Sequence, residues 1–411
     1  MKIVFYNHTG KVSGAERLLL SVLGRLAEGE FAPVALCPND GPLAEMVAGL
    51  GTPVETVTTL EARFTWRPDQ FLHYCRSFYR VIADFRRQVI KLNPHLIHAN
   101  SIRAGLVATA ATPGLKVKVV WHLHDLLPRH PLSCAVRAVA ALSGRSRMIA
   151  VSEAVSRNFS GYWSWRLRHR IKVILNAIDV TSFSARTSDR EACRTGLSLA
   201  PDEFAIGIVG QLTPRKGQLE LLRAFAKLLD DLPQAVLLVV GAAIFNRDSD
   251  YEQMLRATAA KLGIAQRVKM LGSRQDVPEI ISALDLLVIN SRREPFGLVA
   301  CEAMACGTPV LATACDGLPE IIKHQRNGWL VAYGDEAEMV SAIKFLHARR
   351  DVRSELAVTA QQNVAQRFSM HRYLNELQTF YYTIHKEGFA RQEVASAPGP
   401  NQEKEFHPEV I

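Results

Sequence analysis

The sequence predicts an α/β protein built from two Rossmann-like, doubly wound domains that face each other across a cleft. Three observations support this fold class. The chain has 411 residues, which is more than one typical hydrophobic core accommodates. Short runs rich in Val, Ile and Leu alternate with longer amphipathic segments, as expected for buried parallel strands and the helices that cover them. Each half of the chain carries its own series of such alternating segments, which indicates two doubly wound sheets.

The expected strands are the apolar runs themselves, because strands buried on both faces lack a strict polar–apolar alternation. In the first half they cover residues 3–6, 34–37, 54–57, 95–99, 117–122, 148–151 and 173–175. In the second half they cover residues 205–209, 235–240, 268–271, 286–289, 309–312 and 329–331.

We expect the domain boundary between residues 176 and 200, where the stretch 181–195 is mixed polar without a clear period. This boundary gives an N-terminal domain over residues 1–180 and a C-terminal domain over residues 200–370. Near the end of the chain, an apolar stripe at helical spacing predicts a further helix; it consists of Leu374, Leu377, Tyr381 and Ile384. Residues 395–411 lack apolar periodicity and are expected to form a disordered tail.

Composition fits a soluble enzyme, with 48% hydrophobic and 22% charged residues. The formal charge of +9 suits phosphorylated ligands or an anionic membrane surface and does not single out nucleic acid. The seven cysteines show no metal-binding spacing, which predicts no zinc site and fits a reducing compartment. The first apolar run is too short for a signal peptide, and no run approaches the roughly 20 apolar residues of a membrane span. We therefore expect a cytoplasmic protein whose membrane contact, if any, is peripheral to the inner face of the membrane.

The most specific motif follows the strand at 286–289 and reads EPFGLVACEAMACGTPV. Gly297 lies where a helix should begin, which leaves free N–H groups and a positive dipole end for an anion. Glu294 precedes this helix and Glu302 lies within it. Two carboxylates beside a phosphate are costly unless they bind neutral groups, and sugar hydroxyls fit that role. The alternative is a solvated helix residue at Glu302, against which its small apolar neighbours argue.

Two adjacent cations follow the strand at 205–209 in the segment GQLTPRKG. Arg215 offers a forked set of donors and Lys216 a compact charge, which together suit a diphosphate. A solvated turn is the alternative interpretation of such a pair.

The N-terminal half carries weaker signals at the ends of two strands. The spacing of Gly10 and Gly14 lets the backbone approach an anion at a helix start, although glycines are common in any turn. This spacing is not the dinucleotide fingerprint, which argues against an oxidoreductase. The segment HLHD follows the strand at 117–122, and we expect His124 to face the cleft. A metal site with His122 and a hydrogen-bonded strand-end histidine are the alternatives.

The motifs and their order along the chain resemble those of the retaining family-4 glycosyltransferases (glycosyl transferases group 1), which have the GT-B fold. The matching segments are SGAER (13–17), HD (124–125), VSE (151–153), NAID (176–179), GQLTPRKG (210–217), EPFG (294–297) with a Glu eight positions on, and GLPE (317–320). The resemblance covers about residues 1–388. It departs at Ser13, Ala177 and Asp316, where the family often has glycine, and Asp316 puts the shape of the sugar pocket in doubt.

The resemblance implies that the C-terminal domain holds a nucleotide-diphosphate sugar as donor substrate. Arg215 and Lys216 would hold the diphosphate. Glu302 would bind the ribose and Glu294 the hydroxyls of the transferred sugar. Arg274 would line the base.

The resemblance also assigns roles around the rest of the donor. The backbone at Phe296, Gly297 and Leu298 would meet the sugar or the phosphate. His124 would contact the sugar from the N-terminal domain, and Gly14 would let its loop close on the phosphates. A helix over residues 371–388 would cross back onto the first domain.

These roles predict a hexosyltransferase that retains the anomeric configuration and acts on a glycan, lipid-linked or small-molecule acceptor, in cell-surface polysaccharide or glycolipid biosynthesis. His124, Arg215, Lys216 and Glu294 are the expected catalytic residues. No cofactor is expected; the D-x-D pattern at Asp248 and Asp250 hints at a metal, but the cations can do its electrostatic work. A nucleotide-sugar 2-epimerase and a non-catalytic nucleotide-sugar-binding subunit are the alternatives.

Two basic segments with interleaved aromatic residues bear on the acceptor. They cover residues 63–91 and 162–172. Such segments can lie on anionic membranes, which predicts a lipid-linked or membrane-proximal acceptor. Helices with aromatic side chains in the core and arginines in water would give the same pattern.

Overall fold

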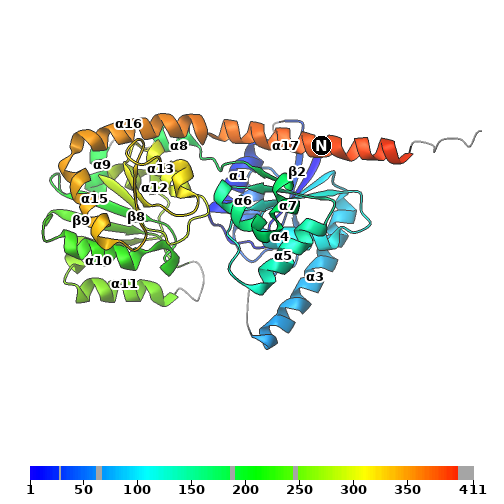
Figure 1. Cartoon of the computed structure of the whole chain (residues 1–411), viewed down its shortest axis with the longest axis horizontal. Coiled ribbons are helices and arrows are strands. Elements are labelled where there is room, and N and C mark those ends of the chain that lie inside the picture. The colour runs from blue at the N-terminus through cyan, green and yellow to red at the C-terminus, as the bar shows by residue number, and fades with distance from the viewer. Residues whose placement is uncertain (27–28, 62–66, 186–189, 244–248, 397–411) are drawn as a thin grey trace, which may run out of the picture.

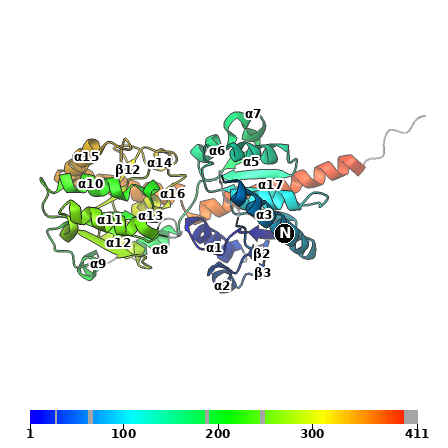
Figure 2. The ribbon, with the colours of Figure 1, turned by 90° about the horizontal axis from the view of Figure 1, so that it is seen from below.

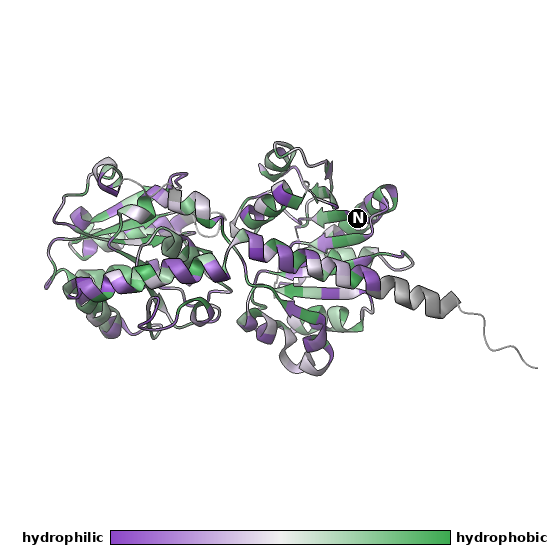
Figure 3. Ribbon diagram, turned by 90° about the horizontal axis from the view of Figure 1, so that it is seen from above, coloured by the Kyte–Doolittle hydropathy of each residue, from purple (hydrophilic) through white to green (hydrophobic). Residues whose placement is uncertain are grey.

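The computed structural model describes residues 1–26, 29–61, 67–185, 190–243 and 249–396. It consists of two parallel sheets, each covered by helices on both faces, that lie side by side along the long axis of the molecule (Figure 1). In Figure 3 the strands are mainly green, and hydrophilic colour gathers on the outer faces of the helices. The predicted α/β fold with two Rossmann-like domains is confirmed.

The first sheet has the strand order β3-β2-β1-β4-β5-β6-β7, and its strand pairs are parallel. Its strands are β1 (Lys2–Tyr6), β2 (Ala32–Cys37), β3 (Val54–Thr56), β4 (Leu96–Ala99), β5 (Lys118–Leu123), β6 (Ser146–Ala150) and β7 (Ile171–Val173). Its helices are α1 (Gly14–Leu26), α2 (Leu43–Ala48), α3 (Pro68–Leu92), α4 (Ile102–Ala111), α5 (Pro131–Leu142), α6 (Glu153–Ser160) and the short α7 (Ser164–Leu167). We call this unit the N-terminal domain.

The second sheet has the strand order β10-β9-β8-β11-β12-β13, again with parallel pairs. Its strands are β8 (Phe204–Val209), β9 (Ala235–Val240), β10 (Val268–Gly272), β11 (Leu286–Ile289), β12 (Val310–Thr313) and β13 (Trp329–Val331). Its helices are α10 (Gln218–Leu228), α11 (Ser249–Lys261), α12 (Val277–Ala283), α13 (Leu298–Ala305), α14 (Leu318–Ile321), α15 (Glu336–Ala348) and α16 (Arg350–Arg367). We call this unit the C-terminal domain.

Each expected strand is present, with ends shifted by at most two residues. The order of strands reverses beside β1 in the first sheet and beside β8 in the second. Ligands of doubly wound sheets bind beyond the carboxyl ends of the strands at this reversal point. The loops after β1, β8 and β11 carry the motifs singled out in the sequence.

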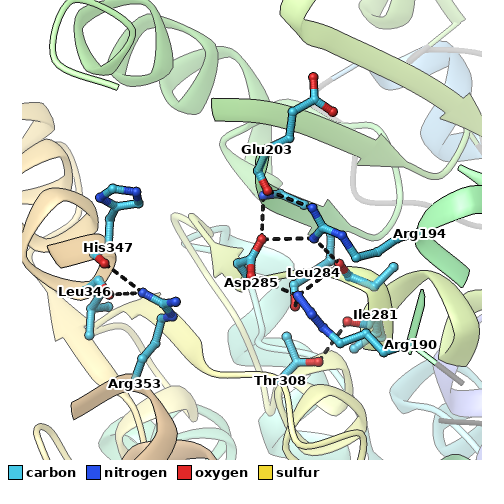
Figure 4. A network of polar contacts seen from close by, with 12 residues as sticks. Arg190, Arg194, Glu203, Ile281, Leu284, Asp285, Thr308, Leu346, His347 and Arg353 are labelled. Carbon is cyan, nitrogen blue, oxygen red and sulfur yellow. Dashed lines mark hydrogen bonds and ion pairs between the residues drawn. The ribbon is translucent and has the colours of Figure 1, made fainter. Parts of the chain in front are cut away.

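Helices α8 (Val180–Ala185) and α9 (Arg190–Gly196) occupy part of the polar stretch that separates the two sheets. Figure 4 shows how α9 is held: Arg190 and Arg194 both donate to the carboxylate of Asp285, at 2.8 and 3.1 Å, and Ala205 N–H donates to it at 2.8 Å. This network lies at the amino ends of β8 and β11, so it stabilises the sheet at the end opposite the motifs. The domain limits 1–180 and 200–370 stay a prediction.

The last helix, α17 (Met370–Ser396), runs from the C-terminal domain along the N-terminal one, as Figures 1 and 2 agree. Its buried side chains pack against Ile3 and Phe5 of β1 and include Tyr373, Leu377, Tyr381 and Ile384. Tyr381 Oη is 2.7 Å from His98 Nδ1 in β4. The predicted crossing helix is therefore confirmed, but it ends at Ser396 and not near residue 388. The expected tail was wrong for residues 395 and 396, which belong to this helix, and residues 397–411 lie outside the described residues.

Candidate functional site

The cations predicted after β8 lie beside the glutamate predicted after β11. A 3-10 helix over Pro214–Lys216 places Lys216 Nζ 2.6 Å from Glu294 Oε2. The two side chains are only 15% and 9% exposed. Arg215 donates to the backbone carbonyl of Arg293 at 2.8 Å. The turn after β8 is thus bonded to the loop after β11, as neighbouring strands allow.

Glu294 is also held by two groups that the sequence did not assign. Ser291 Oγ donates to Glu294 Oε2 at 2.9 Å. Asp316 accepts a hydrogen bond from Glu294 N–H at 3.0 Å and pairs with Arg293. Asp316 has a φ of 42°, a left-handed conformation that glycine adopts freely and aspartate tolerates. The departure from the family's glycine therefore keeps the backbone conformation and adds a carboxylate that fixes the Glu294 loop.

The two glutamates differ in electrostatic environment. Burial raises the pKa of Glu294, but Lys216 and Arg215 outweigh it and hold that pKa below its usual value of 4.5. Burial raises the pKa of Glu302, and the charges of Arg17 and Lys216 only partly oppose this. Lys216 therefore acts on both carboxylates while contacting one. An ionised Glu294 and a Glu302 that protonates more readily suit two different hydroxyl-binding tasks.

Helix α13 starts where predicted, at Leu298, with Gly297 before it at a φ of 110°. L side chains rarely adopt this φ, and a Cβ on Gly297 would also lie 2.7 Å from Leu318 Cδ2, so the position favours glycine. Phe296 is 3% exposed and its ring packs against Phe368 at 5.8 Å. Only the backbone of Phe296 is therefore available to a ligand.

The N-terminal domain reaches α13 through the start of α1. A Cβ on Gly14 would lie 3.3 Å from Leu298 Cδ1, so the starts of α1 and α13 lie close together. Arg17 follows on α1 and its charge acts on Glu302. Arg17 is thus a cation that the sequence analysis did not assign.

His124 follows β5, as predicted, and is half-buried. Its Nε2 is 3.0 Å from Asn100 Oδ1, and its ring contacts that of His122 in a tilted arrangement, with centroids 3.8 Å apart. Burial lowers the pKa of His124 to about 3. The side chain of the next residue, Asp125, is exposed; desolvation by the surrounding protein raises its pKa, and the charges of Arg215 and Glu294 from the other domain also act on it. The His-Asp segment therefore lies near the Lys216–Glu294 pair.

A second contact between the domains involves Glu320 of α14. Its two carboxylate oxygens each accept a hydrogen bond at 2.8 Å, from Glu153 N–H and Ala154 N–H at the start of α6. Ser152 Oγ donates to Pro295 O at 2.6 Å beside them. Glu153 and Glu320 belong to the VSE and GLPE motifs, but nothing in the sequence indicates this contact between them.

Other predictions fall outside this cluster. Arg274 forms an ion pair with Asp276 in the loop after β10, and no contact among the described residues joins it to the Lys216–Glu294 pair. Asp248 lies outside the described residues, and Asp250 lies in the first turn of α11. In the described ranges, no group of three or more His, Cys, Asp or Glu is arranged to hold a metal ion. Among the helices that the structure describes, none is long and apolar enough to cross a bilayer.

The basic, aromatic segments are exposed in part. Tyr79 of α3 is 74% exposed, and Tyr162 and Trp165 near α7 are 98% and 72% exposed. Phe85 is buried in the core. Residues 63, 64 and 66 lie outside the described residues. The alternative in which the aromatic side chains face the core is therefore wrong for Tyr79, Tyr162 and Trp165, whereas it holds for Phe85.

Comparison with known proteins agrees with this geometry. Residues 12–182 match the model of Glycosyltransferase Family 4, and residues 189–363 match that of Glycosyl transferases group 1. A D-inositol 3-phosphate glycosyltransferase of Mycobacterium marinum is 39% identical over 176 residues, covering 42% of this chain and 36% of the relative. The protein of that name from Rhodococcus opacus is 30% identical over 305 residues, covering 70% of this chain and 68% of the relative.

Among solved structures, a crystal structure of Anabaena Alr3699/HepE in complex with UDP-glucose is 29% identical, with a TM-score of 0.81. The match covers 93% of this chain and 100% of that one. The chain spans 36% to 54% of the length of the first curated relatives that it matches. Both family models and the longer match, which covers 68% of the Rhodococcus opacus relative, agree: the chain belongs to glycosyltransferase family 4, with the GT-B fold.

Proposed function

We propose that the protein transfers a hexose from a uridine diphosphate sugar to an acceptor, with retention of anomeric configuration and without a metal ion. The observation that carries this proposal is the buried pair of Lys216 and Glu294 at the reversal point of the second sheet, with Glu302 on the helix that starts there. Anabaena HepE, which binds UDP-glucose, supports the choice of base and sugar class.

The donor-binding roles follow from charge and position. Arg215 and Lys216 bind the diphosphate, with the backbone at Gly297 and Leu298 adding N–H donors. Glu302 binds the ribose, and Glu294 binds hydroxyls of the sugar, held in place by Ser291. Gly14 allows α1 to approach the phosphates, His124 contacts the sugar, and Arg274 lines the base.

Transfer then needs no carboxylate nucleophile. The acceptor oxygen bonds to the anomeric carbon on the face from which the diphosphate departs. The bond between that carbon and the phosphate oxygen breaks, and a phosphate oxygen takes the acceptor proton. Arg215, Lys216 and the start of α13 stabilise the charge that develops on the leaving group, which is the largest contribution in such reactions.

The test is turnover of a panel of nucleotide sugars with excess chelator present. We expect UDP-hexoses to be turned over in chelator, with retained configuration by NMR of the product. Lys216→Met should reduce kcat by about 10²-fold or more, the effect of losing one preorganised donor. Near-normal turnover of that variant would refute the assignment. Product formed without any acceptor would indicate an epimerase, and binding without turnover a non-catalytic subunit.

A second proposal concerns the acceptor, for which the exposed aromatic residues near α7 are the supporting observation. Arg166 lies over the Trp165 ring at 5.2 Å, beside the exposed Tyr162. An exposed aromatic side chain among arginines suits an anionic membrane surface. We therefore propose a cytoplasmic protein that binds the inner face of the membrane peripherally and uses a lipid-linked or membrane-proximal acceptor in cell-surface glycan or glycolipid synthesis.

Flotation with anionic liposomes tests this second proposal. Trp165→Ser should reduce the bound fraction, while Tyr382→Ser, an exposed aromatic on α17, should not. Equal flotation of both variants, or no binding by the unmodified protein, would remove the membrane proposal without touching the donor assignment.

A further inference from the structure

A chain of side-chain hydrogen bonds joins Glu16 to His124 inside the N-terminal domain. Asn7 Nδ2 donates to Glu16 Oε1 at 3.3 Å, and Asn100 Nδ2 donates to Asn7 Oδ1 at 3.1 Å. Asn100 Oδ1 is in turn 3.0 Å from His124 Nε2. Asn7 follows β1, Asn100 follows β4 and His124 follows β5. Glu16, Asn7 and Asn100 are 5%, 1% and 2% exposed, so water cannot replace these partners.

The acceptors around Glu16 fix which end of each asparagine amide donates and which accepts along this series of hydrogen bonds. Asn7 Nδ2 lies near two acceptors, Glu16 Oε1 and the backbone carbonyl of Thr9 at 2.6 Å. The Glu16 carboxylate accepts from Ser13 N–H and Ser13 Oγ as well, at 3.0 and 2.5 Å. A carboxylate and a carbonyl on one side of Asn7 both require its NH₂ group there, because neither can donate. Asn7 must therefore present its oxygen to Asn100.

The orientation of Asn7 in turn fixes the orientation of Asn100 and the position of the hydrogen on His124. Asn100 must present its NH₂ group to Asn7 Oδ1, which leaves Asn100 Oδ1 facing His124. An amide oxygen only accepts, so His124 Nε2 must carry the hydrogen. Hydrogen-bond networks of this kind are the basis on which amide orientations and histidine tautomers are assigned.

We propose that Glu16 is a positioning residue that sets the tautomer of His124 from three hydrogen bonds away, with the proton on Nε2 and a lone pair on Nδ1. The proposal rests on the proposed function of His124 at the sugar. Burial keeps that ring neutral, so the tautomer decides its chemistry. With Nδ1 unprotonated, His124 accepts a hydrogen bond from a hydroxyl of the sugar or acceptor and does not donate one through that atom.

Glu16 has a second task, which the test must separate from the first. Its other oxygen, Oε2, holds Ser13 in the loop before Gly14. That loop meets Leu298 of the C-terminal domain. A change at Glu16 therefore disturbs both the loop and the histidine, whereas Ser13→Ala weakens the loop contact and leaves the amide chain intact.

The experiment reads the tautomer directly in protein labelled with ¹⁵N-histidine. Long-range ¹H–¹⁵N correlation distinguishes a protonated Nε2 from a protonated Nδ1, and the spectrum of His124→Gln assigns the resonances. We expect Nε2–H in the unmodified protein and in Ser13→Ala. A spectrum showing Nδ1–H in the unmodified protein overturns the proposal, whether or not any variant folds.

Glu16→Gln should disturb the direction of these hydrogen bonds. Ser13 N–H still needs an acceptor, so the glutamine oxygen turns toward Ser13 and its NH₂ group toward Asn7, which favours turning both asparagines. The Thr9 carbonyl still favours the NH₂ group of Asn7, so His124 should become a mixture of the two tautomers, with Nδ1–H appearing beside Nε2–H. A wrong tautomer of a catalytic histidine can cost up to about 10⁴-fold in kcat; because only part of the protein takes it, we expect kcat to fall by about 2–10-fold, with a smaller change in donor KM. Ser13→Ala should instead change donor KM more than kcat.

The double variant Glu16→Gln/Asn100→Asp serves as the rescue. An aspartate beside His124 Nε2 restores an acceptor at that atom without Glu16, so Nε2–H should return and kcat should rise above that of Glu16→Gln. A folded Glu16→Gln protein with unchanged tautomer and kcat would overturn the proposal. Normal kcat in His124→Gln would instead refute the proposed role of His124, while the spectra would still decide what Glu16 does.

Discussion

Replacing Lys216 by Met should reverse the response of the C-terminal domain to acid. In the unmodified protein the pKa of Glu294 is held below 4.5. Its contribution to stability is therefore present above pH 4.5 and is lost as the pH falls through the folded-state pKa. Without Lys216, burial is opposed only by Arg215 and Ser291, and the pKa of Glu294 rises above 4.5. The variant should then become more stable as the pH is lowered from 7 to 5.

The size of the effect follows from the burial of the pair. Removing one partner of a buried ion pair costs about 3–5 kcal/mol. We expect the lower end, because Ser291 and Arg215 remain beside Glu294. A loss of about 3 kcal/mol corresponds to a fall in melting temperature of about 6–12 °C for a domain of this size.

The assay is thermal unfolding at pH 5 and pH 7 by circular dichroism and calorimetry. Lys227→Met is the matched control, because Lys227 pairs with Glu336 at the same 2.6 Å but is 63% exposed. Exposed pairs contribute little, so this control should melt near the unmodified protein at both pH values. Lys216→Met/Glu294→Gln should recover most of the loss. A variant whose stability changes between pH 7 and 5 in parallel with that of the unmodified protein would refute the reasoning.

Three further predictions concern Gly297, Asp285 and Glu320. Gly297→Ala should destabilise the C-terminal domain by about 1–3 kcal/mol, because alanine at this positive φ is strained and its Cβ would meet Leu318; an unchanged melting curve would contradict this. Asp285→Ala should lower the free energy of unfolding by about 1–3 kcal/mol, because Arg190, Arg194 and Ala205 N–H lose the carboxylate that they share, although backbone carbonyls still accept from both arginines. Donor KM should not change, since the network lies at the opposite end of the sheet; urea unfolding and kinetics measure the two quantities, and a raised KM would count against the prediction. Glu320→Gln should weaken the contact between the two domains, because one of two charge-assisted hydrogen bonds, worth about 1.5–3 kcal/mol each, is lost. Small-angle scattering should show a larger radius of gyration, and kinetics should show a donor KM raised about 10-fold. No change in either quantity would disprove that Glu320 holds the domains together.

The fold was predictable because its signals are local. Each strand is a short run of Val, Ile and Leu, as at Ala235–Val240, and burial on both faces makes such runs contiguous in sequence. The start of α13 was equally predictable from Gly297. The limits of α17 were harder to predict, since the chain beyond residue 388 has no apolar stripe to mark the end of a helix.

The supporting residues of the site were not predictable because their partners are far away in sequence. Glu16 acts through Asn100, and Glu320 binds the start of α6, 166 residues away in the case of Ala154. Each is an ordinary helical glutamate until the fold brings the partner close. The motifs that contain them were recognised, but a motif does not show which atom a carboxylate bonds.

The crossing helix has a consequence for biosynthesis. Tyr381 is hydrogen-bonded to His98, which precedes it by 283 residues, and it packs with Phe5 from the start of the chain. During translation the N-terminal domain emerges first but lacks this helix until residues 370–384 have been made, whereas the sheet of the C-terminal domain is complete earlier. The nascent chain must therefore keep an uncovered apolar face on its first sheet while the ribosome synthesises a whole second domain, a state prone to misassembly. Chains stalled before residue 370 should depend on chaperones for this reason.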